Sequence, residues 1–277
     1  MVSLMSLACS ASRYYCLVHY TMLFTVIHMI ASSTSGRPYS TFDVLGLVLS
    51  LGVGASMSFT VAHELVHSTD DTERALSALL LLPNFYMHWG RAHLQHHAHV
   101  GTPNDPTTSR KGETVFAFWV RSVVGNFVNA FKAEWKRPKG GNVAMWIGAP
   151  LAFLGATYAV YGWLGAAVLV GQAIVSIIML ETVNYIEHYG LVRENKGAVL
   201  PKHSWNSSTS FGNAVSFNLQ RHSDHHASAQ KPYYLLESIK QAPQLPAGYP
   251  AMMLLSLVPP LWFKTMDPLL AATQTKS

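Results

Sequence analysis

The sequence predicts an all-α integral membrane protein built as a helical bundle. Only 12% of the 277 residues are charged, about half of the roughly 25% typical of soluble globular proteins. Aliphatic and aromatic residues make up 49% of the chain, and they gather in a few long runs rather than at amphipathic spacing. The 19 Lys and Arg residues are unevenly distributed between these runs. All three observations favour a membrane-embedded chain, which we expect to form one domain over residues 1–277.

Four apolar stretches are long enough to cross a bilayer as helices. A helix rises about 1.5 Å per residue and must cover roughly 30 Å of hydrocarbon. The first stretch is interrupted by His19 and His28, and with Arg13 as its charged flank it also matches a signal peptide. The four predicted spans cover residues 14–31, 42–62, 143–161 and 165–183.

The basic residues predict which parts of the chain face the cytoplasm. Nine of the 19 Lys and Arg residues lie between the second and third spans, and six more lie between the fourth span and residue 240. By the positive-inside rule, segments 63–142 and 184–249 are cytoplasmic, and the turn at 161–165 lies on the opposite side. Because no basic stripe carries interleaved aromatic residues, we expect a lipid bilayer as partner and no nucleic acid. The expected location is a bacterial inner membrane, as a multi-pass protein.

Shorter apolar segments predict helices that lie at the membrane surface. Residues 75–82 and 251–263 are too short or too broken by proline to span, so they look interfacial or re-entrant. Residues 115–135 alternate large apolar residues with polar ones, which predicts an amphipathic interfacial helix. The two cysteines, Cys9 and Cys16, lie far from every histidine cluster and indicate neither a disulfide framework nor a zinc-cysteine site.

Nine of the 14 histidines have spacings typical of metal ligands. Neutral imidazole suits iron, zinc, copper or nickel, and nine donors exceed the four to six positions of one ion, so two metal ions are expected. The nine histidines form four clusters, at 63–67, 93–97, 188 and 222–226. All four fall at cytoplasmic span ends or in cytoplasmic segments, which predicts one histidine-rich cap with a shared metal centre. The predicted ligands are His63, His67, His93, His96, His97, His188, His222, His225 and His226.

Each cluster also has a simpler interpretation. The H-E-L-V-H sequence at 63–67 matches the zinc-protease pattern, but such a protease needs one further ligand rather than seven. Spacings of three and four put imidazoles on one helical face, and two copies of H-x-x-H-H argue against ordinary surface histidines. A lone His188 is usually a core residue, yet Glu181 and Asn184 line the same face, and ionisable groups near a span are generally functional.

Several polar residues beside the predicted ligands are candidates to accept the second ring N–H of a histidine and fix its tautomer. Ordinary solvated charges are the alternative for the carboxylates. The sequence singles out no substrate-binding residue. These second-shell candidates are Glu64, Glu181, Asn184, Glu187 and Asp224.

Four sequence motifs resemble those of the membrane alkane 1-monooxygenases, within the wider family of histidine-rich membrane fatty acid desaturases and hydroxylases. The motifs are H-E-L-V-H at 63–67, T-P-N-D-P at 102–106, N-Y-I-E-H-Y-G-L at 184–191 and L-Q-R-H-S-D-H-H-A at 219–227. The resemblance runs from about residue 42 to 268. It implies two non-haem iron ions, O2 as oxidant, and electrons from rubredoxin and rubredoxin reductase. The implied reaction is hydroxylation of the terminal methyl of a medium-chain alkane held in a dry channel.

The chain departs from that family pattern in three places. Ala92 and Gln95 stand where the second box usually has Glu and Gly, and Ser68 stands where a basic residue is usual. Two spanning helices usual at the N-terminus are missing, so we interpret the chain as an incomplete or divergent member. A fatty acyl desaturase or an aryl-methyl hydroxylase remains open as an alternative. So does a zinc-binding membrane transporter or an inactive truncated homologue.

Overall fold

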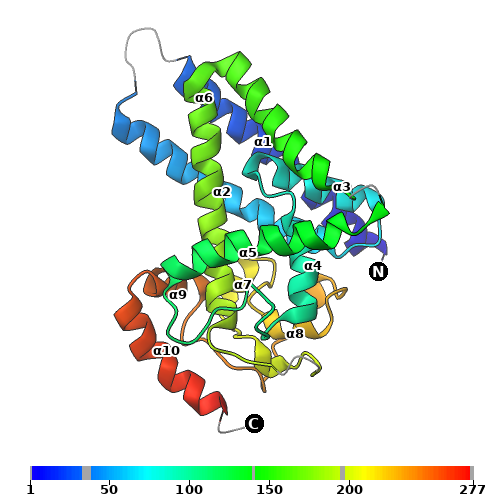
Figure 1. The fold of residues 1–277 in the computed structure, drawn as a ribbon, viewed down its shortest axis with the longest axis vertical. Helices are drawn as coiled ribbons and strands as arrows, with labels where there is room; N and C mark the ends of the chain where they lie inside the picture. Colours follow the sequence, from blue (N-terminus) through cyan, green and yellow to red (C-terminus); the bar gives the residue numbers. More distant parts are fainter. Residues whose placement is uncertain (1, 33–38, 139–140, 194–196, 275–277) are drawn as a thin grey trace. The chain divides into compact units, whose positions relative to one another are not determined.

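The computed structural model describes residues 2–32, 39–138, 141–193 and 197–274 (Figure 1). Within these ranges every named element is helical, and one isolated β-bridge joins Asn206 to Gln244. The predicted all-α fold class is therefore confirmed. The α-helices are α1 (Val2–Ala31), α2 (Thr41–Val66), α3 (Asp71–Leu81), α4 (Trp89–His99), α5 (Val115–Trp135), α6 (Val143–His188), α7 (Ser210–Val215), α8 (His222–Ala227), α9 (Tyr249–Ser256) and α10 (Pro259–Gln274). Short 3-10 turns are η1 (Leu82–Asn84), η3 (Pro201–His203) and η4 (Tyr233–Leu235).

The chain forms two compact units, each made of two segments. Unit 1 contains residues 1–90 and 133–179, and unit 2 contains residues 91–132 and 180–277. Unit 1 therefore holds α1 to α3 and most of α6. Unit 2 holds most of α4 and α5, the end of α6, and α7 to α10.

Three helices in the described residues are long and apolar enough to cross a membrane: Arg13–Ala31 within α1, α2, and α6. The 46-residue α6 is not one straight helix, because Gly162 has φ 67° and ψ −168°. A side chain disfavours this positive φ, so glycine permits the sharp change of direction visible at the top of α6 in Figure 1. The two arms coincide with the predicted spans 143–161 and 165–183, and Gly162 lies in the predicted turn.

An apolar core joins the long helices of unit 1. Leu23 and Ile27 of α1 pack with Leu51 of α2 and Leu169 of α6, and all four are buried. At Gly52 a Cβ would lie 2.4 Å from the Cβ of Val175. Only glycine therefore allows α2 and α6 to approach this closely, as small residues do between membrane helices.

A buried hydrogen-bond network ties η1 to the spanning helices of unit 1. The Asn84 amide donates to Ser58 Oγ on α2 at 3.1 Å and accepts from Ser176 Oγ on α6 at 2.6 Å. Gln172 Nε2 of α6 donates to the Pro83 carbonyl at 2.7 Å. Because hydrocarbon offers no water to polar groups, these bonds fix how η1 is anchored between α2 and α6.

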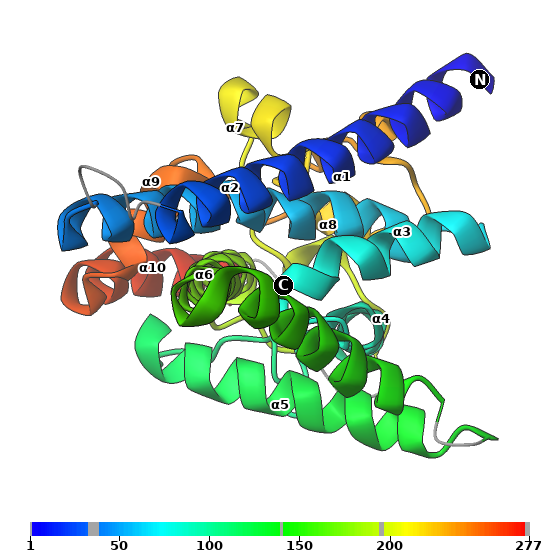
Figure 2. The same ribbon diagram turned by 90° about the horizontal axis from the view of Figure 1, so that it is seen from above.

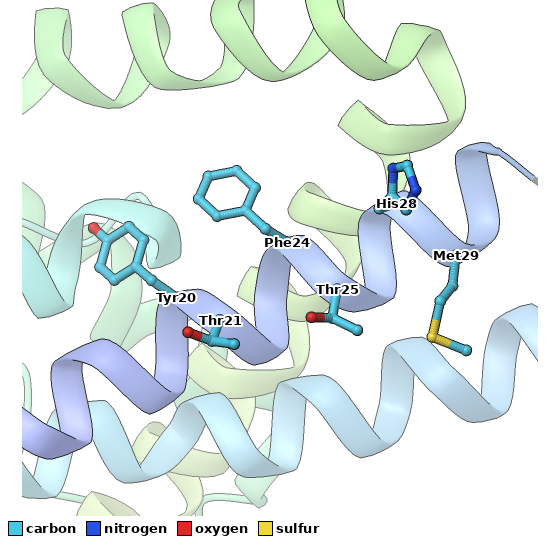
Figure 3. Close-up of a pocket in the computed structure, with 6 residues that line it drawn as sticks. All are labelled: Tyr20, Thr21, Phe24, Thr25, His28 and Met29. Atoms are coloured by element: carbon cyan, nitrogen blue, oxygen red, sulfur yellow. The ribbon is translucent and has the colours of Figure 1, made fainter.

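The outer faces of the unit 1 helices are apolar. Leu45, Leu49 and Val53 lie along one side of α2 and are 53%, 55% and 48% exposed, as expected where lipid replaces water. An open pocket of about 450 Å³ lies along α1. Figure 3 shows its lining in two rows, with Tyr20, Phe24 and His28 on one side of the helix and Thr21, Thr25 and Met29 on the other.

Unit 2 is built around a cluster of buried aromatic residues. Tyr185 of α6 and Tyr189, the residue after α6, pack with Trp205 and with Trp262 of α10. Helices α9 and α10 lie side by side (Figures 1 and 2). They divide the predicted apolar segment 251–263 at Leu257, just before Pro259, because proline favours a new helix start.

Helix α5 has the bounds predicted from the sequence, 115–135. Its exposed side carries Phe116, Val120 and Val124, whereas Ser122 and Asn126 are buried. This arrangement is the reverse of a helix on a water-soluble protein, where exposed apolar patches are small. It supports the prediction that α5 is an amphipathic helix at the membrane interface.

Candidate metal centre

Three elements of unit 2 carry seven of the nine predicted histidine ligands. Helix α4 supplies three, His188 is the last residue of α6, and the six-residue α8 supplies three more. Their ring nitrogens fall into two sets. The His222 group consists of His96, His188, His222 and His226, and the His97 group consists of His93, His97 and His225.

The His222 group brings four buried imidazoles together. Their ligand nitrogens all lie within 4.8 Å of one another. The Nε2 atom of His222 lies 3.1 Å from that of His188 and 3.0 Å from that of His226. A metal–nitrogen bond of about 2.0–2.1 Å sets neighbouring ligand nitrogens roughly 3.0–3.4 Å apart. The spacing therefore suits one metal ion.

Hydrogen bonds at the far side of two rings fix their tautomers. His188 Nδ1 lies 3.1 Å from the carbonyl oxygen of His203, which can only accept, so Nδ1 carries the proton and Nε2 keeps its lone pair. His96 Nδ1 lies 2.8 Å from Asp105 Oδ2, and the same argument applies. Such a partner on the second nitrogen is usual for metal-binding histidines.

Asp105 is itself held firmly. It accepts hydrogen bonds from the Thr108 hydroxyl at 2.6 Å and from the Thr107 backbone N–H at 3.1 Å. Burial alone would raise the pKa of Asp105, but the charge and hydrogen bond of His96 and the Thr108 hydrogen bond hold it below its usual value. The carboxylate therefore stays ionised and oriented toward His96.

The His97 group is similarly close. His97 Nε2 lies 3.0 Å from that of His93 and 2.9 Å from that of His225. The ring of His97 stacks on the ring of His226, with centroids 4.3 Å apart. The two groups are therefore neighbours within unit 2.

Each H-x-x-H-H box contributes to both groups. His93 and His97 are one helical turn apart and join the same group, whereas His96 points to the other group. On α8, His222 and His226 are one turn apart, and His225 joins the opposite group. The division follows the α-helical period, because residues four apart share a face.

The remaining two predicted ligands, His63 and His67, belong to unit 1. They lie at the C-terminal end of α2 with ring centroids 5.5 Å apart. His63 is buried and its ring lies 6.3 Å from Trp89, while burial lowers the pKa of His67 to about 4. The His67 side chain thus favours the neutral form that binds metal. A single centre shared by all nine histidines combines residues of both units and stays a prediction.

The second-shell candidates lie in different surroundings. Glu187 Oε2 is 3.3 Å from His222 Nε2. Glu181 accepts from Ser122 Oγ at 2.6 Å and from Asn184 Nδ2 at 3.2 Å. Asp224 accepts from Lys231 at 2.8 Å and from the Glu237 backbone. In unit 1, Glu64 is half-buried on α2.

Sequence reasoning missed three contributors to the geometry. Asp105 and the His203 carbonyl orient ligands, and Arg193 caps the end of α4. Arg193 donates from Nε to the Val100 carbonyl at 2.8 Å and from Nη2 to the Ala98 carbonyl at 2.6 Å, and its backbone N–H bonds Gly101. The sequence offers one signal, for Asp105, which is a carboxylate between two prolines shortly after a histidine box.

Burial favours neutral imidazoles in this part of unit 2. The pKa of His226 is lowered well below its usual value, first by desolvation and then by the neighbouring histidines. Neutral rings with Nε2 lone pairs directed together form a metal-binding donor set. The class of protein defined here is a helical membrane protein with a histidine-lined metal site.

The family is identified by comparison with known proteins. The family model described as fatty acid desaturase matches residues 41–256. The chain belongs to this family.

Curated relatives include alkane 1-monooxygenase 1 of Pseudomonas aeruginosa, 41% identical over 81% of this chain and 63% of the relative. Alkane 1-monooxygenase of Acinetobacter baylyi is 38% identical over 84% of this chain and 61% of the relative. The hydroxylase component of xylene/toluene monooxygenase of Pseudomonas putida is 33% identical over 80% of this chain and 63% of the relative. The chain thus spans somewhat less than two thirds of the length of these relatives.

Proposed function

We propose that the protein is a non-haem di-iron monooxygenase that hydroxylates the terminal methyl of medium-chain alkanes. The observation that carries this proposal is the set of four buried imidazoles whose ligand nitrogens lie within 4.8 Å of one another. Three further histidines form a neighbouring group in the same unit. Relatives of about 40% identity are named alkane 1-monooxygenases. We propose all nine predicted histidines as ligands of two iron ions.

The residues of the chain perform three tasks in this reaction. The imidazoles hold the metal ions, and Asp105 and the His203 carbonyl keep the Nε2 lone pairs of His96 and His188 available. Burial of the site excludes water and strengthens electrostatic interactions. Apolar helices of membrane-spanning length provide an environment in which an alkane dissolves. Bound iron supplies the O2 chemistry required to break a terminal C–H bond, which offers no acidic or basic group to a side chain.

The electron donor and the orientation belong to the same proposal. We expect rubredoxin, reduced by rubredoxin reductase, to deliver two electrons for each O2, giving a primary alcohol and water. The basic segments 63–142 and 184–249 carry the histidine clusters, so the metal site faces the cytoplasm of a bacterial inner membrane.

The test uses the full chain purified in detergent, with Fe(II), reduced rubredoxin, O2 and octane. The expected result is 1-octanol by gas chromatography, together with about two iron ions per chain. A fatty acyl substrate converted to an alkene without any alcohol would contradict the proposal and favour a desaturase. Two zinc ions and no oxygen-dependent product would favour a metal transporter.

A second candidate is hydroxylation of a methyl group on an aromatic ring. It is favoured by the 33% identity to the hydroxylase component of xylene/toluene monooxygenase. Toluene offered in the same assay distinguishes the two candidates, because benzyl alcohol formed faster than 1-octanol would support the aromatic substrate.

A further inference from the structure

A buried carboxylate lies beside the metal-facing nitrogens of unit 2. Glu187 precedes His188 at the end of α6 and is 2% exposed. Its Oε2 atom lies 3.3 Å from His222 Nε2. Its Oε1 atom accepts a hydrogen bond from the Tyr249 hydroxyl at 2.9 Å. Both carboxylate oxygens therefore have defined positions.

The contact is made with the nitrogen that faces the other ligands. An outer-sphere carboxylate usually accepts from the ring nitrogen that points away from the metal, as Asp105 does at His96 Nδ1. Glu187 instead approaches His222 Nε2, the atom that lies 3.1 Å from His188 Nε2 and 3.0 Å from His226 Nε2. An ion shared by these three nitrogens is thus within reach of Glu187 Oε2.

The charge of the site supports the same conclusion. Four neutral imidazoles bring no charge of their own to a buried divalent ion, and a buried charge is costly unless it is paired. The carboxyl group of Glu187 lies 3.3 Å from a ligand nitrogen, where its ionised form would pair with the bound ion. A carboxylate oxygen beside imidazole nitrogens is also a donor combination typical of non-haem Fe(II).

We propose that Glu187 is an oxygen donor to the ion held by the His222 group, and that Tyr249 is a positioning residue that holds the carboxylate in place. This inference rests on the proposed function, because it deepens the description of that metal site. Tyr249 is buried, and its hydroxyl fixes Oε1 and leaves Oε2 directed toward the histidines. The site then has four nitrogen donors and one oxygen donor.

The test compares Fe(II) affinity in the full chain, measured anaerobically by competition with a chelator. Glu187→Gln is expected to weaken Fe(II) binding at least tenfold, since loss of even an outer partner costs about 10–100-fold. Asp267→Asn is the matched control, because Asp267 also accepts a tyrosine hydroxyl, from Tyr189 at 2.9 Å, in the same unit. It is expected to leave the affinity unchanged.

Two further variants keep the test decisive if Glu187→Gln folds poorly. Glu187→Asp retains the charge but withdraws the oxygen, and Tyr249→Phe removes only the hydroxyl. Both are expected to weaken Fe(II) binding severalfold, while their metal-free unfolding temperatures stay within a few degrees of the wild type. Equal Fe(II) affinity in Glu187→Asp, Tyr249→Phe and Asp267→Asn overturns the assignment.

The outcome is separable from that of the proposed function. A wild-type protein that binds Fe(II) but makes no alcohol from octane contradicts the monooxygenase proposal. The affinity comparison still decides the role of Glu187 in that case. Alcohol formation with unchanged affinity in all three Glu187 and Tyr249 variants overturns only the role of Glu187.

Discussion

Replacing Asp105 tests how the protein fixes the orientation of a metal ligand. The carboxylate accepts three buried hydrogen bonds, from His96 Nδ1 at 2.8 Å, Thr108 Oγ1 at 2.6 Å and Thr107 N–H at 3.1 Å. Asp105→Asn keeps the volume but places an NH2 group where two donors now point. We expect the His96 ring to lose its fixed tautomer.

The magnitude follows from known effects of such partners. Loss of the hydrogen-bond partner of a ligating histidine weakens metal binding by about 10–100-fold, which is about 1.4–2.7 kcal/mol. Asp105→Ala removes all three hydrogen bonds and leaves the histidine without its buried partner, so a loss of about 3–5 kcal/mol in the free energy of unfolding is expected. The pKa of Asp105 is held low in the folded protein. Its stabilisation is therefore present above the usual aspartate pKa of about 3.9 and is lost as the pH falls below it.

The assay is chelator competition for Fe(II) at pH 7.5, with thermal unfolding of the metal-free protein measured in parallel. Glu113→Gln serves as control, because the Glu113 carboxylate pairs with Arg121 at 2.6 Å and accepts from the backbone N–H of Arg110 at 2.9 Å. Wild-type Fe(II) affinity in Asp105→Asn would refute the reasoning, since the His96–Asp105 bond could then not set the tautomer.

Three further predictions concern stability. Arg193→Ala removes donors to two carbonyls at the end of α4 and should lower the unfolding temperature by about 4–12 °C, for a loss of about 2–3 kcal/mol. Arg193→Lys cannot form a fork of donors, so it should restore less than half of the lost unfolding temperature, and full restoration would contradict the capping role. Burial lowers the pKa of both His88 and His203 to about 4, so the unfolded chain binds more protons below pH 6.5, and the free energy of unfolding should fall as pH drops from 6.5 to 4. Urea denaturation should show that the free energy of unfolding of His203→Gln depends less steeply on pH, and an unchanged dependence would contradict the role of His203. Gly52→Leu should lower the free energy of unfolding by about 1–3 kcal/mol through overpacking, because a Cβ there meets Val175 at 2.4 Å. Gly46→Ala should be tolerated, because the space around its Cβ is open, and equal unfolding temperatures of the two variants would contradict the close packing of α2 and α6.

Local sequence patterns predicted the helices well. Apolar length predicted the long helices, and the Gly162 break falls between the third and fourth predicted spans. The alternation of residues 115–135 predicted the bounds of α5. These features depend on residues near one another in the chain, so periodicity contains the necessary information.

The site was only partly predictable, because its finer geometry depends on loops. The spacing of His93, His96 and His97 indicated ligands but did not reveal that one box is divided between two groups. The partners of the rings come from segments without periodicity, such as Asp105 and the carbonyl of His203. Glu187 was expected to support a histidine from behind, whereas it lies 3.3 Å from the nitrogen that faces the other ligands.

The division of the six-residue α8 between the two groups has a consequence for metal loading. His225 and His226 are adjacent in the chain but belong to different groups. So short a helix is marginal by itself in water, and an ion bound to either group immobilises the backbone that presents the other group. With two metal ions bound as proposed above, occupancy of the first site lowers the entropy cost of filling the second. The two sites should fill with positive cooperativity, so that partly metallated molecules are rarer than independent binding would give.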